Sequence, residues 1–366
     1  MTGPLVVTGG GGFLGWHLRV LARALGFPPP VLVTRADLAD HRRLAGLLDA
    51  AELVVHVAGV NRGDPAVVSA GNLDLARALS AALAACTTPP KAVSFANSVQ
   101  AGNGTPYGDS KAAAAALLAD AARDAGSAFH DVRLPNLFGE HGRPFYNSVV
   151  ATFCRQLADG AALSIVDPDR ELVLAHATDA AALLLDTTTV DDIPVGRRTV
   201  GQLAGTLHRF ADRYRTGEIP DLRDRFEVRL FNTYRSHLFP ANTPLRPARH
   251  ADARGELVEA VRAHTAGQAF YSSTRPGATR GDHFHLAKVE RFLVLRGEGE
   301  IRLRRVLHDD VVRFRVSGRE PAIVDMPTMW AHSITNVGDG ELVTLFWSND
   351  IFDPDRPDTY REVVGP

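Results

Sequence analysis

The sequence has little cysteine, no excess of charge of either sign and no long apolar run. Cys86 and Cys154 are its only cysteines, so neither a disulfide framework nor a cysteine zinc site can be built. The formal net charge of -2 argues against a general affinity for nucleic acid or acidic membranes. No apolar run reaches membrane-spanning length, and no basic leader precedes the first apolar segment. We therefore expect a soluble, cytoplasmic protein with no nucleic-acid or membrane partner.

An apolar segment near the start breaks into glycines and then into a helical pattern. The string LVVTGGGGFLG begins at residue 5, and its glycine spacing is that of short-chain dehydrogenases. One glycine allows a left-handed turn, one lets a pyrophosphate approach, and one lets the helix pack on the strand. The predicted cofactor-binding residues of this turn are Gly9, Gly12, Phe13, Leu14 and Gly15. A purely structural turn is the alternative.

Short apolar runs alternate with longer helical patterns up to about residue 134. This alternation is typical of a parallel sheet covered by helices. Strands are predicted at 5–7, 31–33, 53–57, 92–95 and 129–134, with helices starting near residues 12, 38, 66 and 107. The first part of the chain is therefore predicted to have an α/β Rossmann-type fold.

Positions just after two of these strands indicate which cofactor binds. Arg35 follows the second strand, where a carboxylate would bind the ribose hydroxyl of NAD and a guanidinium suits the extra phosphate of NADP. We predict NADPH; a surface role for Arg35, with Asp37 binding NAD, is the alternative. After the third strand, Ala58 and Gly59 are small enough for the cofactor to lie against the sheet edge, and Arg62 can reach a substrate phosphate.

Tyr107 and Lys111 carry the strongest catalytic signal. Four residues apart on a helix, they share one face. The lysine charge is expected to lower the phenol pKa and to hold the nicotinamide ribose, while the tyrosine exchanges a proton with a carbinol oxygen. Ser98, at the end of the fourth strand, would bind the same oxygen. The Asp–Glu pair that sugar dehydratases use does not follow Ser98, which leaves reduction, oxidation or epimerisation.

The middle of the chain, about 146–242, fits the small substrate lobe of an extended dehydrogenase. Helices are predicted at 148–158 and 200–214, a strand at 171–175, and a further helix from Asp179. The proline-bearing stretch 239–247 is predicted to be a linker. The predicted domains are 1–243, an NADP-binding extended short-chain dehydrogenase/reductase, and 244–366, a metal-binding domain.

After residue 247 the pattern changes to short strands separated by turns, which predicts an all-β barrel. Histidines one residue apart on a strand point to the same side, and a nearby glutamate and a facing-strand histidine complete a ligand set. The predicted metal ligands are His283, His285, Glu290 and His332. Zinc, manganese, iron and nickel all suit such ligands. This is the cupin pattern, except that Met329 replaces the usual glycine of its second motif.

Cationic side chains crowd the same region of the sequence. They are Arg254, Arg280 and Lys288. A cationic rim suits the diphosphate of a sugar nucleotide. Each of the three, taken singly, can equally be a solvated surface charge.

Both halves together resemble the bifunctional capsular-polysaccharide enzymes of the CapF type, which join an extended short-chain dehydrogenase/reductase to a C-terminal cupin. The resemblance spans nearly the whole chain. It is carried by SVQ at 98–100, YGDSK at 107–111, YNSVVATFC at 146–154, NTY at 232–234, PGATRGDHFH at 276–285 and PDTY at 357–360.

The resemblance implies two reactions in series. The cupin, with zinc, would epimerise a UDP-4-keto-6-deoxy-N-acetylhexosamine or another nucleotide-linked keto-deoxysugar at C3, and the dehydrogenase would then reduce the C4 ketone with NADPH. The order is chemically sensible, because the ketone acidifies the neighbouring C–H and a metal stabilises the enolate. Lys288 is the candidate epimerisation base, with a salt-bridged surface lysine as the alternative. We also expect a homodimer.

Three other functions are kept open. One is an NADP-dependent 4-ketoreductase whose cupin does not epimerise. Another is a metal-dependent dioxygenase activity of the cupin half. The third is a nucleotide-sugar-binding protein, against which the proton relay of Ser98, Tyr107 and Lys111 argues, since binding alone does not need it.

Overall fold

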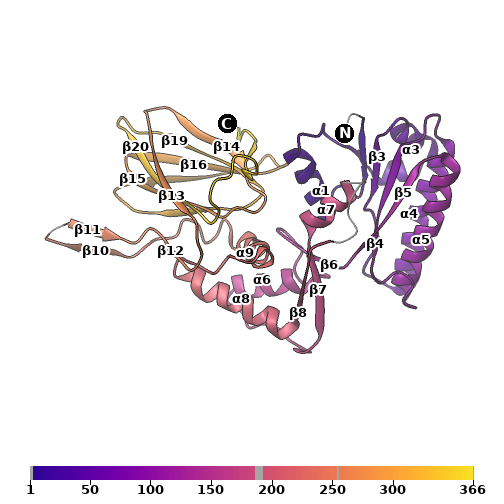
Figure 1. Ribbon diagram of the computed structural model, residues 1–366, viewed down its shortest axis with the longest axis horizontal. Helices are drawn as coiled ribbons and strands as arrows, with labels where there is room; N and C mark the ends of the chain where they lie inside the picture. The colour runs from indigo at the N-terminus through magenta and orange to yellow at the C-terminus, as the bar shows by residue number, and fades with distance from the viewer. Residues whose placement is uncertain (1–2, 186–192, 254, 366) are drawn as a thin grey trace. The chain divides into compact units, whose positions relative to one another are not determined.

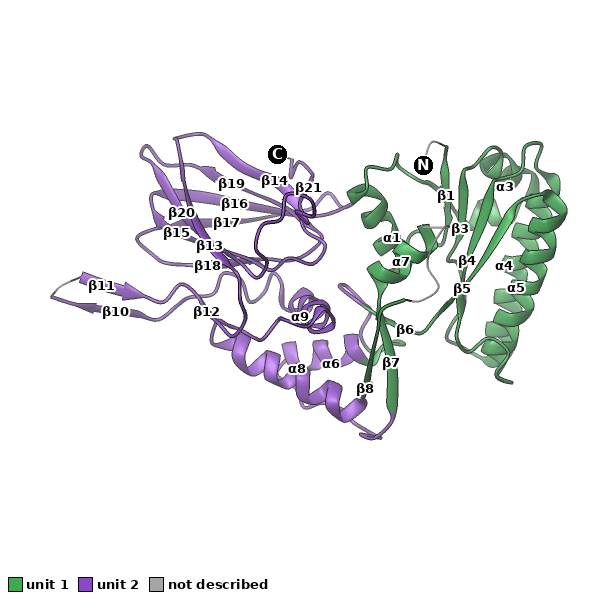
Figure 2. Cartoon of the chain, in the orientation of Figure 1, with its two compact units in different colours: residues 1–138, 145–149, 171–198 green, residues 139–144, 150–170, 199–366 purple. Residues whose placement is uncertain are grey.

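The computed structural model describes residues 3–185, 193–253 and 255–365, and their contacts divide the chain into two compact units (Figures 1 and 2). Unit 1 combines residues up to 138 with 145–149 and 171–198. Unit 2 combines 139–144, 150–170 and everything from 199. The contacts thus group residues 199–243 with the C-terminal strands, whereas the domain boundary predicted at 243/244 stays a prediction.

Unit 1 contains the predicted Rossmann-type sheet. Its five strands pair in parallel in the order β2-β1-β3-β4-β5. Their bounds are β1 Leu5–Thr8, β2 Val31–Val33, β3 Leu53–His56, β4 Ala92–Ser98 and β5 Ala128–Leu134. The order reverses between β1 and β3, and the crevice beyond the carboxyl ends of such strands is where ligands bind in open α/β sheets.

Helices cover this sheet, and the predicted helix near residue 38 differs from the structure. Two short helices lie there, because Thr34 caps the first and Asp40 accepts hydrogen bonds from the backbone N–H groups that begin the second. The helices of unit 1 are α1 Phe13–Ala24, α2 Arg35–Leu38, α3 His41–Leu48, α4 Pro65–Ala85, α5 Pro106–Ala125 and α7 Ala177–Leu185.

A second, three-stranded sheet has the order β6-β7-β8. Its strands are β6 Asn136–Phe138, β7 Glu171–His176 and β8 Val195–Thr199. Only β7 was predicted, because β6 is too short to show an alternating pattern and β8 is polar. None of the described helices is both long and apolar enough to cross a membrane.

Unit 2 contains two antiparallel sheets with apolar side chains from both in one buried cluster, as predicted for a cupin-like barrel. The sheet orders are β13-β20-β15-β18 and β17-β16-β19-β14-β21. The strands are β13 Gln268–Thr274, β14 Thr279–Phe284, β15 Glu290–Arg296, β16 Glu298–Arg305, β17 Val311–Ser317, β18 Ile323–Met326, β19 Trp330–Asn336, β20 Leu342–Ser348 and β21 Tyr360–Arg361. Phe292, Leu303 and Phe346 belong to the buried cluster.

The other elements of unit 2 are helices and short strand pairs. They are α6 Val149–Ala158, α8 Val200–Arg215, α9 Arg225–Leu238, the pair β9 Glu218–Ile219 with β12 Arg262–Ala263, and the hairpin of β10 Arg249–Asp252 with β11 Gly255–Val258. The first of these helices and α8 lie close to their predicted limits.

Helix α9 was not predicted, and its polar side chains attach it to the barrel. Arg229 donates to the Leu286 carbonyl at 2.6 Å and Asn232 to that of Ala287 at 2.6 Å. Arg229 and Asn232 are buried, so the helix has polar residues on its inner face. These polar side chains interrupt a buried face that also carries Leu230, Phe231, Tyr234 and Leu238.

A buried ion pair in the barrel lies next to helix α8. Arg291 donates to both carboxylate oxygens of Asp325, at 2.7 and 2.9 Å, and both side chains are 2% exposed. The Tyr214 hydroxyl donates to the same carboxylate at 2.8 Å. Because Tyr214 lies in the last turn of α8 while the ion pair bridges β15 and β18, this network joins the helical layer to the barrel.

Candidate cofactor and metal sites

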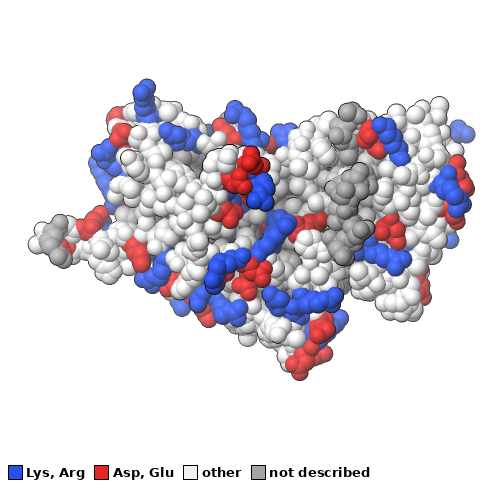
Figure 3. All heavy atoms as spheres, in the orientation of Figure 1, with Lys and Arg blue, Asp and Glu red and all other residues white. Residues whose placement is uncertain are grey.

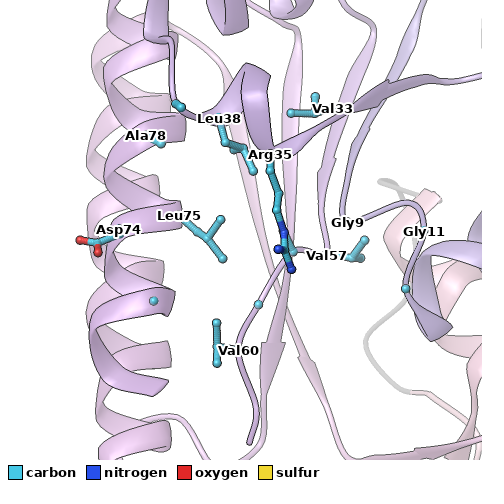
Figure 4. Close-up of a pocket in the computed structure, with 15 residues that line it drawn as sticks. Gly9, Gly11, Val33, Arg35, Leu38, Val57, Val60, Asp74, Leu75 and Ala78 are labelled. Atoms are coloured by element: carbon cyan, nitrogen blue, oxygen red, sulfur yellow. The ribbon is translucent and has the colours of Figure 1, made fainter. Parts of the chain in front are cut away.

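A cavity of about 860 Å³ opens at the carboxyl ends of β1, β2 and β3 (Figure 4). The predicted cofactor residues that line it are Gly9, Gly12, Arg35, Ala58 and Gly59. Phe13, Leu14, Gly15, Tyr107 and Lys111 are not among its lining residues. The volume matches the range of natural ligand pockets, and the location is where a dinucleotide is expected in this sheet order.

The glycine turn has the conformation that its spacing predicts. Gly9 has φ +70°, and a Cβ there would lie 2.6 Å from the backbone nitrogen of Ala58. A Cβ on Gly15 would lie 2.3 Å from the Gly9 carbonyl oxygen. Both positions therefore require glycine, the first for the turn and the second for the close packing of α1 on it.

Arg35 and Asp37 have different surroundings. Figure 4 shows the Arg35 side chain extending into the cavity. The Asp37 carboxylate instead accepts from the backbone N–H of Thr34 at 2.8 Å and from its hydroxyl at 2.6 Å, and pairs with Arg43 at 2.5 Å. Asp37 is buried and does not line the cavity. Its carboxylate is thus used within the α2 cap, whereas Arg35 faces the cavity.

One wall of the cavity was missed by sequence reasoning. It comes from α4, which contributes Gly71, Asp74, Leu75 and Ala78 (Figure 4). These residues form no motif, and only the packing of α4 beside the sheet brings them to the cavity. No local pattern in the sequence marks them.

Lys111 is buried in the second turn of α5, beneath the end of β4. Its ammonium donates to the Ala96 carbonyl at 2.6 Å and lies 4.0 Å from the centre of the Phe95 ring. Burial lowers the pKa of Lys111 to about 8, although the negative charge of Asp131 acts to raise it. The amine is therefore held in a fixed place at the end of the strand that carries Ser98.

Ser98 and Tyr107 are linked by a hydrogen bond that lowers the Tyr107 pKa, but burial outweighs it and the pKa is raised. This differs from our expectation that Lys111 would lower the phenol pKa, because the lysine is not among the groups that shift it. Ser98 itself is anchored: its N–H donates to Asn97 Oδ1 at 2.8 Å, and Asn97 donates to Asp131 at 2.6 Å. The phenol is thus kept protonated.

The cationic residues are engaged within the protein. Arg62 donates to the Phe145 carbonyl at 3.0 Å and lies over the Tyr146 ring. Arg280 donates to the Thr274 hydroxyl and the Ser273 carbonyl, each at 3.0 Å. Arg254 lies outside the described residues. On the face drawn in Figure 3, basic and acidic side chains are interspersed.

The four predicted metal ligands come together in unit 2. His283 and His285 lie at the end of β14, Glu290 begins β15, and His332 lies in β19. One ligand atom from each lies within 4.8 Å of the others. The register of β14 against β19 shifts between Gly281 and His283, and such a bulge re-aims side chains at a site.

Hydrogen bonds to the outer ring nitrogens orient two of these histidines. His285 Nδ1 donates to the Asp358 carbonyl at 2.5 Å, and His332 Nδ1 to the Trp330 carbonyl at 3.2 Å. Since a carbonyl can only accept, both rings carry their proton on Nδ1, and each Nε2 lies 3.3 Å from Glu290 Oε2. If both rings are neutral, their Nε2 lone pairs point at the negatively charged Glu290 carboxylate, which is unfavourable. A cation bound between these atoms would remove that repulsion.

The spacing and charge of the cluster also fit a divalent metal. Ligand atoms about 2.0–2.1 Å from a tetrahedral zinc ion lie about 3.3 Å apart, which is the separation between Glu290 Oε2 and each Nε2. Without a metal, protonated His285 and His332 would hold the pKa of Glu290 well below its usual value in spite of its burial. Burial and these histidines lower the pKa of His283 to about 3, which leaves its ring neutral.

The burial of Lys288 and the backbone conformation of Met329 are two features that the sequence alone did not indicate. Lys288 is buried, not a surface lysine, and its ammonium donates to the Pro357 carbonyl at 2.7 Å and the Thr359 hydroxyl at 3.3 Å. Met329, in place of the motif glycine, adopts φ +62° and donates from its N–H to the His285 carbonyl at 2.8 Å. The turn therefore keeps a left-handed conformation without glycine.

Comparisons with known proteins match both halves of the chain. Residues 5–196 match the NAD dependent epimerase/dehydratase family, and residues 250–360 match the polysaccharide biosynthesis C-terminal domain. A curated relative, UDP-2-acetamido-2,6-beta-L-arabino-hexul-4-ose reductase from Pseudomonas aeruginosa, is 31% identical over 99% of each chain.

Solved structures give the same result for the fold. The crystal structure of the capsular polysaccharide assembling protein CapF from Staphylococcus aureus is 32% identical and covers 98% of this chain and 100% of that one, with a TM-score of 0.61. UDP-glucose 4-epimerase from Thermotoga maritima shares the fold over 57% of this chain and 82% of that one, at 19% identity and a TM-score of 0.51.

Proposed function

This chain belongs to the NAD dependent epimerase/dehydratase family, and from that membership we propose that it is a bifunctional nucleotide-sugar enzyme. The cupin epimerises a UDP-4-keto-6-deoxy-N-acetylhexosamine at C3, and the dehydrogenase unit then reduces the C4 ketone with NADPH. The observation that carries the proposal is the match over 99% of each chain to a relative named as a UDP-hexulose reductase. The match includes the C-terminal part of the chain, where residues 250–360 match the polysaccharide biosynthesis C-terminal domain.

For the reduction, bound NADPH would supply the hydride that C4 receives. Tyr107 gives its hydroxyl proton to the ketone oxygen, and its raised pKa keeps that proton available at neutral pH. Ser98 holds the same oxygen by a hydrogen bond. Lys111, fixed beneath β4 by the Ala96 carbonyl, holds the nicotinamide ribose.

The preference for NADPH is supported by the different surroundings of Arg35 and Asp37. Arg35 extends into the cavity (Figure 4), where its guanidinium can pair with a ribose phosphate. Asp37 would have to bind the free ribose hydroxyls of NAD, but its carboxylate is engaged by Thr34 and Arg43.

For the epimerisation, His283, His285, Glu290 and His332 would hold a divalent cation, whose chemistry would be Lewis-acid stabilisation of the charge that develops on the ketone oxygen. Zinc is the metal we propose. Lys288 is the candidate base that removes the C3 proton. It is buried two residues before Glu290 and, among the described side chains, pairs with no carboxylate.

The test follows both reactions on one sample. Wild-type protein, a UDP-4-keto-6-deoxy-N-acetylhexosamine and NADPH are mixed in deuterated water, with absorbance at 340 nm and deuterium at C3 as readouts. We expect NADPH oxidation and C3 deuteration, and loss of the oxidation alone in Tyr107→Phe. Absence of NADPH oxidation overturns the proposal.

A second candidate is a 4-ketoreductase whose cupin does not epimerise. The printed activity of the Pseudomonas relative, a reductase only, favours it. NADPH oxidation without any deuterium at C3 would establish it in place of the bifunctional enzyme. Oxygen uptake in the presence of substrate would instead point to a dioxygenase activity of the cupin.

A further inference from the structure

The C-terminal segment 357–362 lies against the loop that carries the metal ligands. In β21, Tyr360 and Arg361 pair with Phe284 and His283 of β14. The N–H of Glu362 donates to the Asp282 carbonyl at 2.9 Å. The segment therefore extends the sheet at the strand that bears His283 and is followed directly by His285.

Asp358 makes the most contacts in this segment. Its carboxylate accepts from three successive backbone N–H groups, those of Leu286 at 2.9 Å, Ala287 at 2.9 Å and Lys288 at 2.7 Å. Three charge-assisted hydrogen bonds on one carboxylate fix the backbone between His285 and Glu290. Asp358 has φ +41°, a conformation that aspartate tolerates better than most residues.

The backbone carbonyl of the same residue accepts from His285 Nδ1 at 2.5 Å. In a neutral ring that bond keeps the proton on Nδ1 and leaves the lone pair on Nε2, the atom that lies 3.3 Å from Glu290 Oε2. Partners of this kind on the outer nitrogen typically change metal affinity about 10–100-fold when they are lost. Asp358 thus acts on the cluster twice, through the ring of His285 and through the loop that follows it.

We propose that Asp358 is a positioning residue for the metal centre and that metal binding and the contacts of the C-terminal segment with the ligand loop stabilise each other. This inference rests on the proposed function, because it takes the four-residue cluster to be a metal site. Asp358 touches none of the reacting atoms. It holds His285 and the 286–288 backbone in the geometry in which the cluster binds its ion.

The test measures zinc affinity by competition with a chromogenic chelator. Asp358→Ala should bind zinc about 10–100-fold more weakly than the wild type, and Asp358→Asn, which keeps one acceptor oxygen and suits the left-handed backbone, should fall between them. Asp353→Ala is the matched control: this carboxylate, which precedes the segment in the chain, contacts Asp355 and Arg356 instead, so the zinc affinity should be unchanged. Unfolding curves and NADPH binding verify that each variant is folded.

A second measurement uses the wild type alone, so that it does not depend on the folding of a variant. Amide hydrogen exchange of residues 286–288 and 358–364 should slow on adding zinc to metal-free protein. If the wild type binds no zinc, the proposed metal centre itself fails. If the wild type binds zinc but folded Asp358→Ala binds it equally well, or zinc leaves these amides unprotected, the role of Asp358 is refuted while the metal centre stands.

Discussion

The Nε2 atom of His332 lies 3.3 Å from Oε2 of Glu290, and the His332 side chain is fully buried. This nitrogen has no hydrogen-bond partner among the described residues. A buried polar atom without a partner costs free energy unless something else satisfies it. The relationship between these two residues is thus the strongest structural support for the proposed metal site.

Replacing Glu290 should weaken metal binding while leaving cofactor binding intact. Glu290→Gln removes the only negative charge of the cluster, and we expect zinc affinity to fall on the order of 100-fold because a carboxylate ligand is lost. Chelator competition measures the change. Glu300→Gln is the control, since that carboxylate pairs with Arg302 and Arg315 instead. Equal zinc affinity in Glu290→Gln and the wild type would contradict the metal assignment.

Arg35 should set the choice between the two nicotinamide cofactors. A charge-assisted hydrogen bond contributes about 1.5–3 kcal/mol, so Arg35→Ala should raise the KM for NADPH by about 10–150-fold and leave that for NADH nearly unchanged. Steady-state kinetics with both cofactors measure this. Arg42→Ala is the control: Arg42 is exposed on α3, the helix that follows α2, so the KM for neither cofactor should change. Equal losses with NADPH and NADH would refute phosphate recognition by Arg35.

The buried Lys111 should make stability depend on pH in a defined window. Its pKa is about 8 when folded and 10.5 ordinarily, so between these values the unfolded chain binds more protons and the free energy of unfolding rises with pH. Between pH 8 and 9 the rise due to this group is on the order of 1 kcal/mol. In urea titrations of protein without cofactor, Lys111→Met should lack that rise. A wild type and variant with parallel pH profiles would show that Lys111 keeps its ordinary pKa.

The ion pair between Arg291 and Asp325 should contribute far more to stability than one at the surface. Asp325→Ala leaves a buried guanidinium without its partner, which typically costs about 3–5 kcal/mol. Glu341→Ala removes the partner of Arg296 at the surface and should cost less than about 1 kcal/mol. Urea unfolding compares the two. Similar losses of unfolding free energy in both variants would show that the buried network is not needed to hold α8 against the barrel.

Much of the architecture follows from local sequence patterns. The five strands of the parallel sheet were predicted from short apolar runs, and the metal cluster from two histidines on one strand with a glutamate and a facing histidine. In each case the signal is periodicity or spacing within a few residues. The closeness of His283 and His332, which lie 49 positions apart in the chain, required only that two strands face each other.

What the sequence did not predict depends on tertiary packing. Helix α9 is attached by the buried Arg229 and Asn232, which resemble surface residues in a pattern of polarity. The α4 wall of the cavity carries no motif. The raised pKa of Tyr107 follows from burial, and burial cannot be inferred from its spacing to Lys111. The homodimer stays a prediction.

The most direct test of two reactions in series compares two substrates in His285→Ala. One is the UDP-4-ketosugar before C3 epimerisation and the other is its C3 epimer, each supplied with NADPH in deuterated water. The proposed function predicts that His285→Ala oxidises NADPH with the epimerised ketone at close to the wild-type rate, but neither deuterates nor reduces the unepimerised one. If His285→Ala reduces the unepimerised ketone as fast as the wild type does, the cupin is not an epimerase acting before the reductase.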